Sequence, residues 1–280
     1  MEKGLRKLGV LAFLFGLVAL LAACGTSEDG DSDSATEDGD YDLEDAYTVV
    51  SDNSFVPFEF VEDGELVGFD IELIKAIAEE AGFAIENDEI ETTNFDGIIP
   101  GLQTGQFEIA IAGMSITEER AKVIDFSDPY YESGIAIGVL SDRDDINGLE
   151  DLDGKTVATR LGTTSGNYLR EHVPGAEINE YEQMDQVYLA VENGSADAVM
   201  YDLPNIEYYI ATEGNGRLKV VGDLYQAEDY GIGITAGNED LVAAINDALA
   251  TLRENGTYDE IYNKWFGDAS NGDADEEEEK

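Results

Sequence analysis

The stretch that decides the fold reads Gly113-Met-Ser-Ile-Thr-Glu-Glu-Arg120-Ala-Lys-Val-Ile-Asp-Phe-Ser-Asp-Pro-Tyr-Tyr131. It follows a short apolar run, residues 107–112, that is bounded by glycines and predicts a buried strand. Ser115 then offers a capping hydroxyl to a helix expected to begin at Glu118. Free backbone N–H groups, a hydroxyl and the Arg120 guanidinium would meet there, which is the chemistry that binds a carboxylate. The alternative is that Arg120 lies on the surface and pairs with its neighbouring glutamates.

Short apolar strands alternate with amphipathic helices on both sides of this stretch, which predicts an α/β fold. The clearest helix is 70–82, with Asp70 as its expected cap and Gly82 as its stop. Further helices are expected at 95–104, 183–192, 203–212 and 239–255. Further strands are expected at 47–50, 83–90, 134–140, 155–159, 196–201 and 230–235. The two halves of the chain have similar content, which indicates two comparable lobes.

The chain is extremely acidic, with a formal net charge of −48 over 280 residues. Such a protein does not bind nucleic acid or an anionic membrane surface through its charge. With 43% hydrophobic residues, it has enough apolar side chains to fold. Because self-repulsion at this density opposes compactness unless salt screens it, we expect a halophile-like protein that works at high salt.

The N-terminus predicts where the protein is located. Basic residues precede the apolar or small residues 8–23, a segment too short to span a bilayer comfortably. It ends Leu21-Ala-Ala-Cys24, which resembles a bacterial lipobox, and Cys24 is the only cysteine. We expect a lipoprotein signal peptide at 1–23 and a two-chain lipid anchor on Cys24. A plain secretory peptide with an incidental cysteine is the alternative.

Acidic segments flank the folded body at both ends. Ten acidic residues and no basic one lie between 28 and 45, so 24–45 is expected to be a disordered, self-repelling tether. Residues 268–280 are expected to be a disordered acidic tail. Neither segment has the spaced pattern of a calcium loop, and no metal site is predicted.

Seven segments, in order, resemble extracellular solute-binding proteins of the polar amino-acid uptake family (family 3), and most of all the glutamine-binding proteins. They are 52–60, 66–70, 94–100, 113–131, 162–164, 197–202 and 251–267. The resemblance implies a type II periplasmic-binding-protein-like α/β fold with two lobes, a ligand cleft between them and two crossover hinge strands. It implies lobe 1 at 46–130 and 231–267, lobe 2 at 135–225, and hinges at 130–134 and 226–230.

The resemblance also implies a set of ligand-binding residues and no catalytic residue. Arg120 would bind the ligand α-carboxylate, helped by backbone N–H groups of Ser115 and Thr164. Asp202 would neutralise the α-ammonium, together with the Gly113 carbonyl and the Ser115 hydroxyl. The full set is Asp52, Phe55, Phe95, Ala112, Gly113, Ser115, Arg120, Arg160, Thr164 and Asp202.

Side-chain recognition would come from four of these positions. Phe55 and Phe95 would enclose the aliphatic part of the ligand. Asp52 and Arg160 would contact its tip, and an acceptor beside a donor suits a carboxamide. The chain departs from the glutamine binders, which carry lysine at Arg160, glycine at Thr164 and histidine at Tyr201. Asp52 could equally bind a cationic side chain.

The expected function is that of a binding protein, not an enzyme. The protein would capture a polar amino acid, with glutamine favoured over a basic amino acid, and deliver it to an ABC permease and its ATPase on other chains. We expect a cofactor-free monomer anchored at the extracytoplasmic face of the cell membrane. A cyclic-acid dehydratase on the same fold and a sensory ligand-binding lobe are the alternatives. The only histidine, His172, lies in a polar helix and is expected to be exposed.

Overall fold

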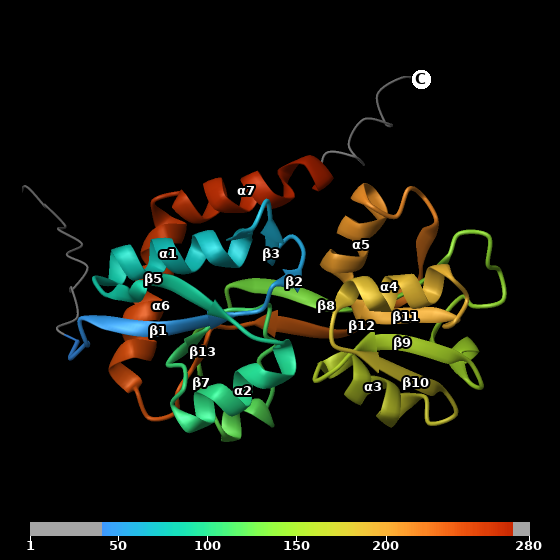
Figure 1. The fold of residues 1–280 in the computed structure, drawn as a ribbon, viewed down its shortest axis with the longest axis horizontal. Helices are drawn as coiled ribbons and strands as arrows, with labels where there is room; N and C mark the ends of the chain where they lie inside the picture. Colours follow the sequence, from blue (N-terminus) through green and yellow to red (C-terminus); the bar gives the residue numbers. More distant parts are fainter. Residues whose placement is uncertain (1–40, 271–280) are drawn as a thin grey trace, which may run out of the picture. The chain divides into compact units, whose positions relative to one another are not determined.

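The computed structural model describes residues 41–270, so Cys24, the predicted signal peptide, almost all of the predicted tether and the end of the predicted tail lie outside the described residues. Two five-stranded sheets form the framework of the described part (Figure 1). The first sheet has the order β5 (Ala84–Thr92), β1 (Ala46–Ser51), β6 (Ile109–Ala110), β13 (Gly233–Ile234) and β7 (Asp125–Phe126). The second has the order β10 (Glu177–Tyr181), β9 (Thr156–Arg160), β11 (Ala198–Asp202), β8 (Tyr131–Leu140) and β12 (Leu218–Tyr230).

Helices flank both sheets, as the alternating pattern predicts. The α-helices are α1 (Phe69–Ala81), α2 (Phe95–Thr104), α3 (Thr164–His172), α4 (Met184–Glu192), α5 (Leu203–Thr212), α6 (Glu239–Glu254) and α7 (Thr257–Ser270). Short elements complete the fold: β2 (Ser54–Phe55), β3 (Glu59–Glu62) and β4 (Glu65–Val67) in a third sheet, and the 3₁₀ turns η1 (Arg120–Lys122) and η2 (Leu149–Leu152). The helices predicted at 95–104 and 203–212 are confirmed at these bounds. Helix α7 continues to Ser270, past the predicted start of the tail.

Helix α1 shows why its sequence forms a helix at this place. Its buried face includes Leu73, Ile74 and Ile77, at helical spacing, and it ends where Gly82 adopts a left-handed φ of 82°. The predicted cap was wrong, because the N-cap is Gly68 and Asp70 lies inside the first turn. The Asp70 carboxylate instead accepts hydrogen bonds from the Gly113 N–H and the Tyr130 hydroxyl.

Strands β8 and β12 connect the two halves of the fold. They pair antiparallel from Leu140 and Leu218 at one end to Tyr131 and Tyr230 at the other. Beyond Tyr230 the chain enters the first sheet, where the Gly231 N–H donates to the Met114 carbonyl at 3.0 Å. The two strands therefore run from the second sheet to the edge of the first. The hinges that the resemblance implies, at 130–134 and 226–230, stay a prediction, and strand β12 itself begins earlier, at Leu218.

The helix expected at Glu118 is not formed, and this prediction was wrong. Only the single 3₁₀ turn η1 is present, and the Arg120 N–H donates to the Thr117 hydroxyl oxygen at 3.2 Å. Ile124 is completely buried and Asp125 already begins β7, which pairs with β13. Because Ile124 is buried and Asp125 already pairs in β7, too few residues remain after Glu118 for an α-helix.

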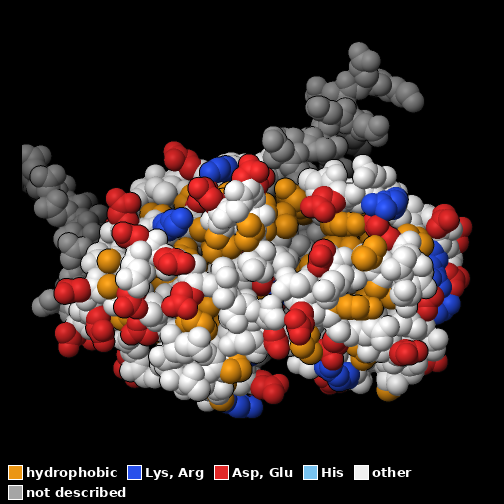
Figure 2. All heavy atoms as spheres, viewed as in Figure 1, with side chains coloured by type: hydrophobic (Ala, Val, Ile, Leu, Met, Phe, Trp, Pro, Cys, Tyr) orange, Lys and Arg blue, Asp and Glu red, His pale blue; other side chains and the backbone are white. Residues whose placement is uncertain are grey.

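Buried apolar side chains fill both halves of the described part. The largest cluster includes Phe58, Phe69, Tyr130 and Tyr230, and its aromatic rings pack edge to face and stacked. Among residues 41–270, no helix has the length and apolar character needed to cross a membrane. Acidic side chains outnumber basic ones over the face shown in Figure 2.

Candidate functional site

The ten predicted ligand residues lie at strand ends, helix starts and loops of both sheets, and all ten are buried. Asp52, Phe55, Phe95, Ala112, Gly113, Ser115 and Arg120 belong to the first half of the fold, around β1, β2, α2, β6 and η1. Arg160 ends β9, Thr164 begins α3 and Asp202 ends β11, all in the second half. In α/β sheets such positions form ligand sites, because loops and helix N-termini converge there.

Arg120 links the two halves through its guanidinium. Nη1 donates to the Ser115 carbonyl at 2.8 Å, and Nη2 donates to the Gly162 carbonyl, in the loop before α3, at 3.3 Å. Burial lowers the pKa of Arg120, while the negative charges of Glu228 and Asp202 oppose that shift. A surface pocket beside this group is lined by Arg120, Gly162 and Thr164, among other residues. Arg120 is thus a buried cation rather than the surface partner of neighbouring glutamates.

Asp52 and Arg160 form an ion pair across the two halves, from Arg160 Nη1 to Asp52 Oδ2. Both side chains are almost fully buried, with 0% and 1% of Asp52 and Arg160 exposed. Arg160 Nε also donates to the Glu182 carbonyl at 3.1 Å. Burial works to lower the pKa of Arg160, but the Tyr201 hydroxyl and the negative charge of Asp52 outweigh it and raise that pKa. The two residues predicted to contact the ligand tip therefore contact each other.

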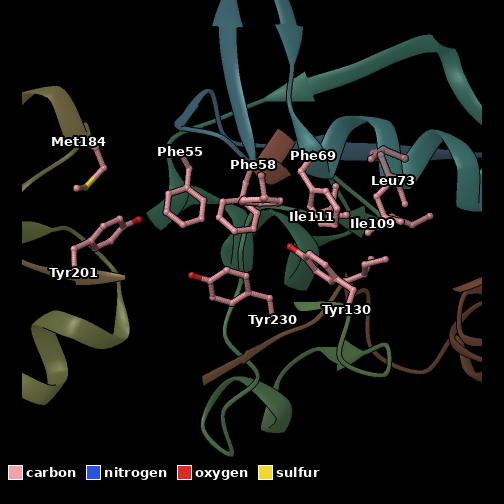
Figure 3. Packing of buried hydrophobic residues seen from close by; sticks show 14 of the residues in the cluster. Phe55, Phe58, Phe69, Leu73, Ile109, Ile111, Tyr130, Met184, Tyr201 and Tyr230 are labelled. Atoms are coloured by element: carbon pink, nitrogen blue, oxygen red, sulfur yellow. The ribbon is translucent and has the colours of Figure 1, made fainter. Parts of the chain in front are cut away.

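The two predicted phenylalanines have different surroundings. The Phe95 ring lies near both arginines, with Cζ of Arg120 at 5.4 Å and Cζ of Arg160 at 5.7 Å from its centroid. Phe55 lies between Phe58, on which it stacks at 4.8 Å, and Tyr201, which it meets edge to face at 5.6 Å (Figure 3). Tyr201 comes from β11, so this aromatic row also joins the two halves.

Asp202 is a buried carboxylate at the end of β11. Its Oδ2 accepts a hydrogen bond from the Tyr230 hydroxyl of β12. Burial and the negative charge of Glu228 raise the pKa of Asp202 to about 7, although Tyr230 and Arg120 act in the opposite direction. This carboxylate is therefore poised to gain a cationic partner, which would favour its ionised form.

Backbone groups of the loop after β6 are held by a second buried carboxylate. The Gly113 N–H donates to Asp70 Oδ2 at 2.8 Å, and the Tyr130 hydroxyl donates to the same oxygen at 2.7 Å. Burial raises the pKa of Asp70 to about 6, against the effect of these two donors. A side chain on Gly113 would collide with the Phe55 ring, whose nearest atom would lie 2.2 Å from an added Cβ. Asp70 and Gly113 thus fix the loop that carries Ser115.

Glu228 is the site residue that the sequence prediction missed. It lies on β12, is 6% exposed, and accepts hydrogen bonds from Ser115 and Thr164, one from each half. A signal for it was present in the predicted crossing strand. Side chains two residues apart share a face of a strand, so Glu228 had to point the same way as Tyr230. Tyr230 begins the strand predicted at 230–235, and the structure buries its side chain completely.

Nothing in this arrangement resembles a metal or nucleophile site. Within residues 41–270, no group of three or more His, Cys, Asp or Glu side chains is placed to hold a metal ion. His172 is exposed at the end of α3, and its Nδ1 lies 3.0 Å from the Tyr168 carbonyl. Apart from the Asp52–Arg160 ion pair, the described site offers the Arg120 guanidinium, the carboxylates of Asp202 and Glu228 and the hydroxyls of Ser115 and Thr164, together with aromatic walls. Such groups can hold a small zwitterion.

Comparison with known proteins identifies the family of the chain. The family model described as bacterial extracellular solute-binding proteins, family 3, matches residues 47–268. The glutamine-binding protein GlnH of an ABC transporter in Bacillus subtilis (strain 168) is 32% identical over 268 residues, covering 91% of this chain and 95% of GlnH. The L-cystine-binding protein TcyJ of Escherichia coli (strain K12) is 32% identical over 219 residues, covering 77% of this chain and 80% of TcyJ.

A solved structure is similar to this chain in its fold. An ancestral arginine-binding protein bound to glutamine is 42% identical and superposes with a TM-score of 0.75, covering 80% of this chain and 99% of that one. The relatives and this structure bind amino acids of different side-chain chemistry. The two-lobed α/β architecture is therefore the type II periplasmic-binding-protein fold, and the chain belongs to the bacterial extracellular solute-binding proteins of family 3.

Proposed function

We propose that this protein captures a polar amino acid, with L-glutamine favoured, and delivers it to an ABC permease on other chains. The observation that carries the proposal is the presence of one buried cation, Arg120, in one half of the fold and the buried carboxylate of Asp202 in the other, close enough for the charge of Asp202 to act on Arg120. A zwitterionic α-carboxylate and α-ammonium complement these two charges. Ser115 and Thr164 supply hydrogen-bonding groups on either side.

Glutamine is favoured because Asp52 and Arg160 neutralise each other. A charged ligand tip would have to compete with an existing buried ion pair, whereas a carboxamide can donate to Asp52 and accept from Arg160 without adding charge. Phe55 and Phe95 would enclose the methylene groups of the ligand. The roles of all ten predicted residues are part of this proposal.

A basic amino acid is the second candidate, and one observation favours it. Beyond the Asp52–Arg160 pair, the described site holds two carboxylates, Asp202 and Glu228, against the single guanidinium of Arg120. A ligand with one net positive charge would balance this surplus. Glutamine is favoured if the ligand side chain ends beside the Asp52–Arg160 pair, and a basic amino acid is favoured if it ends beside Asp202 and Glu228.

The proposal includes the position of the protein in the cell. The family is extracytoplasmic, and the lipobox-like motif supports a lipid anchor on Cys24, with 24–45 as a tether and the protein as a monomer. We place the lobes at 46–130 with 231–267 and at 135–225, with hinges at 130–134 and 226–230. Labelling with a radioactive fatty acid tests the anchor: Cys24→Ala is expected to abolish it, and continued labelling would contradict it.

A thermal-shift screen of the purified protein in high salt against the twenty amino acids tests the proposed function. A ligand at a hundred times its dissociation constant stabilises the folded state by about 2.7 kcal/mol, so a true ligand raises the melting temperature. Glutamine is expected to give the largest shift, and calorimetry then measures its affinity. A shift with arginine, lysine or histidine alone would support the second candidate. No shift with any amino acid would overturn the proposed function, and the dehydratase and sensory alternatives would then be examined.

A further inference from the structure

The carboxylate of Glu228 lies where the two halves of the site meet. Its Oε2 accepts hydrogen bonds from the Ser115 hydroxyl at 2.6 Å and the Thr164 hydroxyl at 2.9 Å. Its other oxygen, Oε1, accepts a hydrogen bond from Gln226 Nε2 at 2.7 Å. Glu228 lies on β12 and pairs with Ser133 of β8. Its backbone therefore belongs to the two strands that connect the halves of the fold. One carboxylate thus receives a donor from each half.

The direction of these hydrogen bonds has a chemical consequence. A hydroxyl has one proton to donate and two lone pairs that accept. Since an ionised carboxylate can only accept, both protons point at Glu228, and the lone pairs of Ser115 and Thr164 remain for other partners. A group that needs acceptors, such as an ammonium, can use those lone pairs. A ligand carboxylate cannot, and has only the backbone N–H groups and Arg120.

The charge around Glu228 favours the same ligand group. Its negative charge acts on Arg120 and contributes to the raised pKa of Asp202. Two carboxylates held near each other in a buried site repel, and a cation placed between them relieves that repulsion. A ligand ammonium group is therefore stabilised both by hydrogen bonds to these lone pairs and by the negative charge of the two carboxylates.

We propose that Glu228 is a positioning residue that makes the site selective for an α-ammonium, by fixing the Ser115 and Thr164 hydroxyls as acceptors from both halves at once. This inference rests on the proposed function, because it assumes an amino acid in the site. Glu228 acts through the two hydroxyls and need not touch the ligand. Since one hydroxyl comes from each half, the acceptor pair is complete only when the halves are together.

The experiment compares two ligands that differ only in the group in question. L-glutamine and L-2-hydroxyglutaramate, in which a hydroxyl replaces the ammonium, are titrated into the wild-type protein and into Glu228→Gln by calorimetry. If the screen selects arginine, L-arginine and its 2-hydroxy analogue are used instead. The amide of the variant can donate to the hydroxyls, which then turn their protons into the site. Asp229→Asn is the control, because it removes the same charge from the exposed neighbour on β12.

The expected result is a change in selectivity rather than a uniform loss. Glu228→Gln should weaken amino-acid binding at least tenfold and binding of the 2-hydroxy analogue less than threefold, whereas Asp229→Asn should change neither by more than twofold. In Ser115→Ala, where one oriented hydroxyl is gone, the same Glu228→Gln change should cost less than in the wild type.

Several outcomes would overturn the inference. Equal losses for both ligands would leave the selectivity ratio unchanged and assign Glu228 a purely structural role, and no loss for either ligand would remove it from ligand recognition. Fully additive effects of Ser115→Ala and Glu228→Gln would disconnect the two residues. If Glu228→Gln does not fold, Thr164→Val provides the measurement, and it should also reduce the selectivity ratio. If the wild-type protein binds no amino acid, the proposed function fails, which is a different result from a wild type that binds and a variant that keeps its selectivity.

Discussion

At the scale of single residues, the site depends on charges removed from water. Asp52 and Arg160 lie in opposite halves of the fold, and each is the other's ionic partner. A buried ion pair contributes little compared with a well-packed apolar pair, but removing one partner leaves an uncompensated buried charge. The pair therefore adds little to the stability of the intact protein, but it restricts which residues these two positions can hold.

We predict that Asp52→Asn lowers the free energy of unfolding by about 3 to 5 kcal/mol, because it leaves the Arg160 guanidinium buried without its counter-charge. Urea denaturation of the variant and of the wild type measures the difference. The partly exposed pair Arg170–Glu180, whose side chains are 49% and 22% exposed, provides the matched control, and Glu180→Gln is expected to cost about 1 kcal/mol or less. Equal costs in the two variants would contradict the prediction and would indicate that water reaches the buried pair.

The carboxylate of Asp202 predicts how ligand binding depends on pH. Its pKa is raised to about 7 by burial and by Glu228, so in the unliganded protein much of it is neutral below that pH. Only the ionised form attracts an ammonium, and the apparent dissociation constant rises as the competent fraction falls. We predict that amino-acid affinity increases roughly tenfold from pH 6 to pH 8. Calorimetric titrations across this range measure it.

A matched variant separates Asp202 from other titrating groups. Asp202→Asn should bind the amino acid more weakly at pH 8 and lose most of the dependence on pH. The contribution of Asp202 to folding stability depends on pH in the opposite direction to its contribution to ligand binding. Because the folded-state pKa lies above 3.8, the ordinary value of an aspartate carboxyl, this group stabilises the fold at low pH and loses that contribution as pH rises towards 7. A wild-type affinity that stays constant from pH 6 to 8 would refute the role of Asp202.

At the scale of elements, the loop between β9 and α3 controls how closely the two halves approach. Gly162 has a φ of 80°, and an added Cβ would lie 3.0 Å from Cβ and 3.2 Å from Cα of Asp96 in α2. Its carbonyl accepts the hydrogen bond from Arg120. Nearby, Gln183 Nε2 donates to Asn94 Oδ1 at 2.8 Å, which also joins the second half to the start of α2. A side chain at Gly162 would push these elements apart.

We predict that Gly162→Ala weakens amino-acid binding at least tenfold, because the halves can no longer meet around the ligand. Left-handed backbone also costs alanine about 1 kcal/mol of stability. Gly154→Ala controls for that cost, since Gly154 has a φ of 74° with no atom within 4 Å of an added Cβ. Thermal melts should show similar losses for both variants, and calorimetry a loss of affinity for Gly162→Ala alone. Equal affinities would show that closure tolerates the extra methyl group.

The sequence predicted elements well where a local pattern determines them. Helices α2 and α5 have the predicted bounds because their apolar spacing and start signals agree. The helix at Glu118 failed because burial of Ile124 and the pairing of β7 with β13 override a local capping signal. Partners across the two halves could not be read from local patterns at all. The contact between Asp52 and Arg160 joins residues far apart in the chain, and only the fold brings them together.

At the scale of the whole molecule, the dominant property is a formal net charge of −48. Few Lys and Arg side chains accompany the acidic ones over the face in Figure 2. The repulsion between like charges at the surface falls as salt shortens the screening length from about 10 Å at 0.1 M to about 3 Å at 1 M. The folded state concentrates these charges more than the unfolded chain does, so salt should stabilise it.

We predict that the melting temperature of the unliganded protein rises steadily from 0.1 M to 2 M sodium chloride, as screening relieves the repulsion. Differential scanning calorimetry across the series measures it. Sodium chloride can also act on apolar surface, so a charge-reduced variant is needed to isolate screening. The strand β5 carries exposed Glu86, Glu89 and Glu91 on the edge of the first sheet, and replacing all three with glutamine removes charge without disturbing the core. If repulsion is the cause, this variant melts higher at 0.1 M and gains less from added salt, whereas parallel salt curves for the two proteins would assign the effect to apolar burial and remove the argument for a salt-adapted surface.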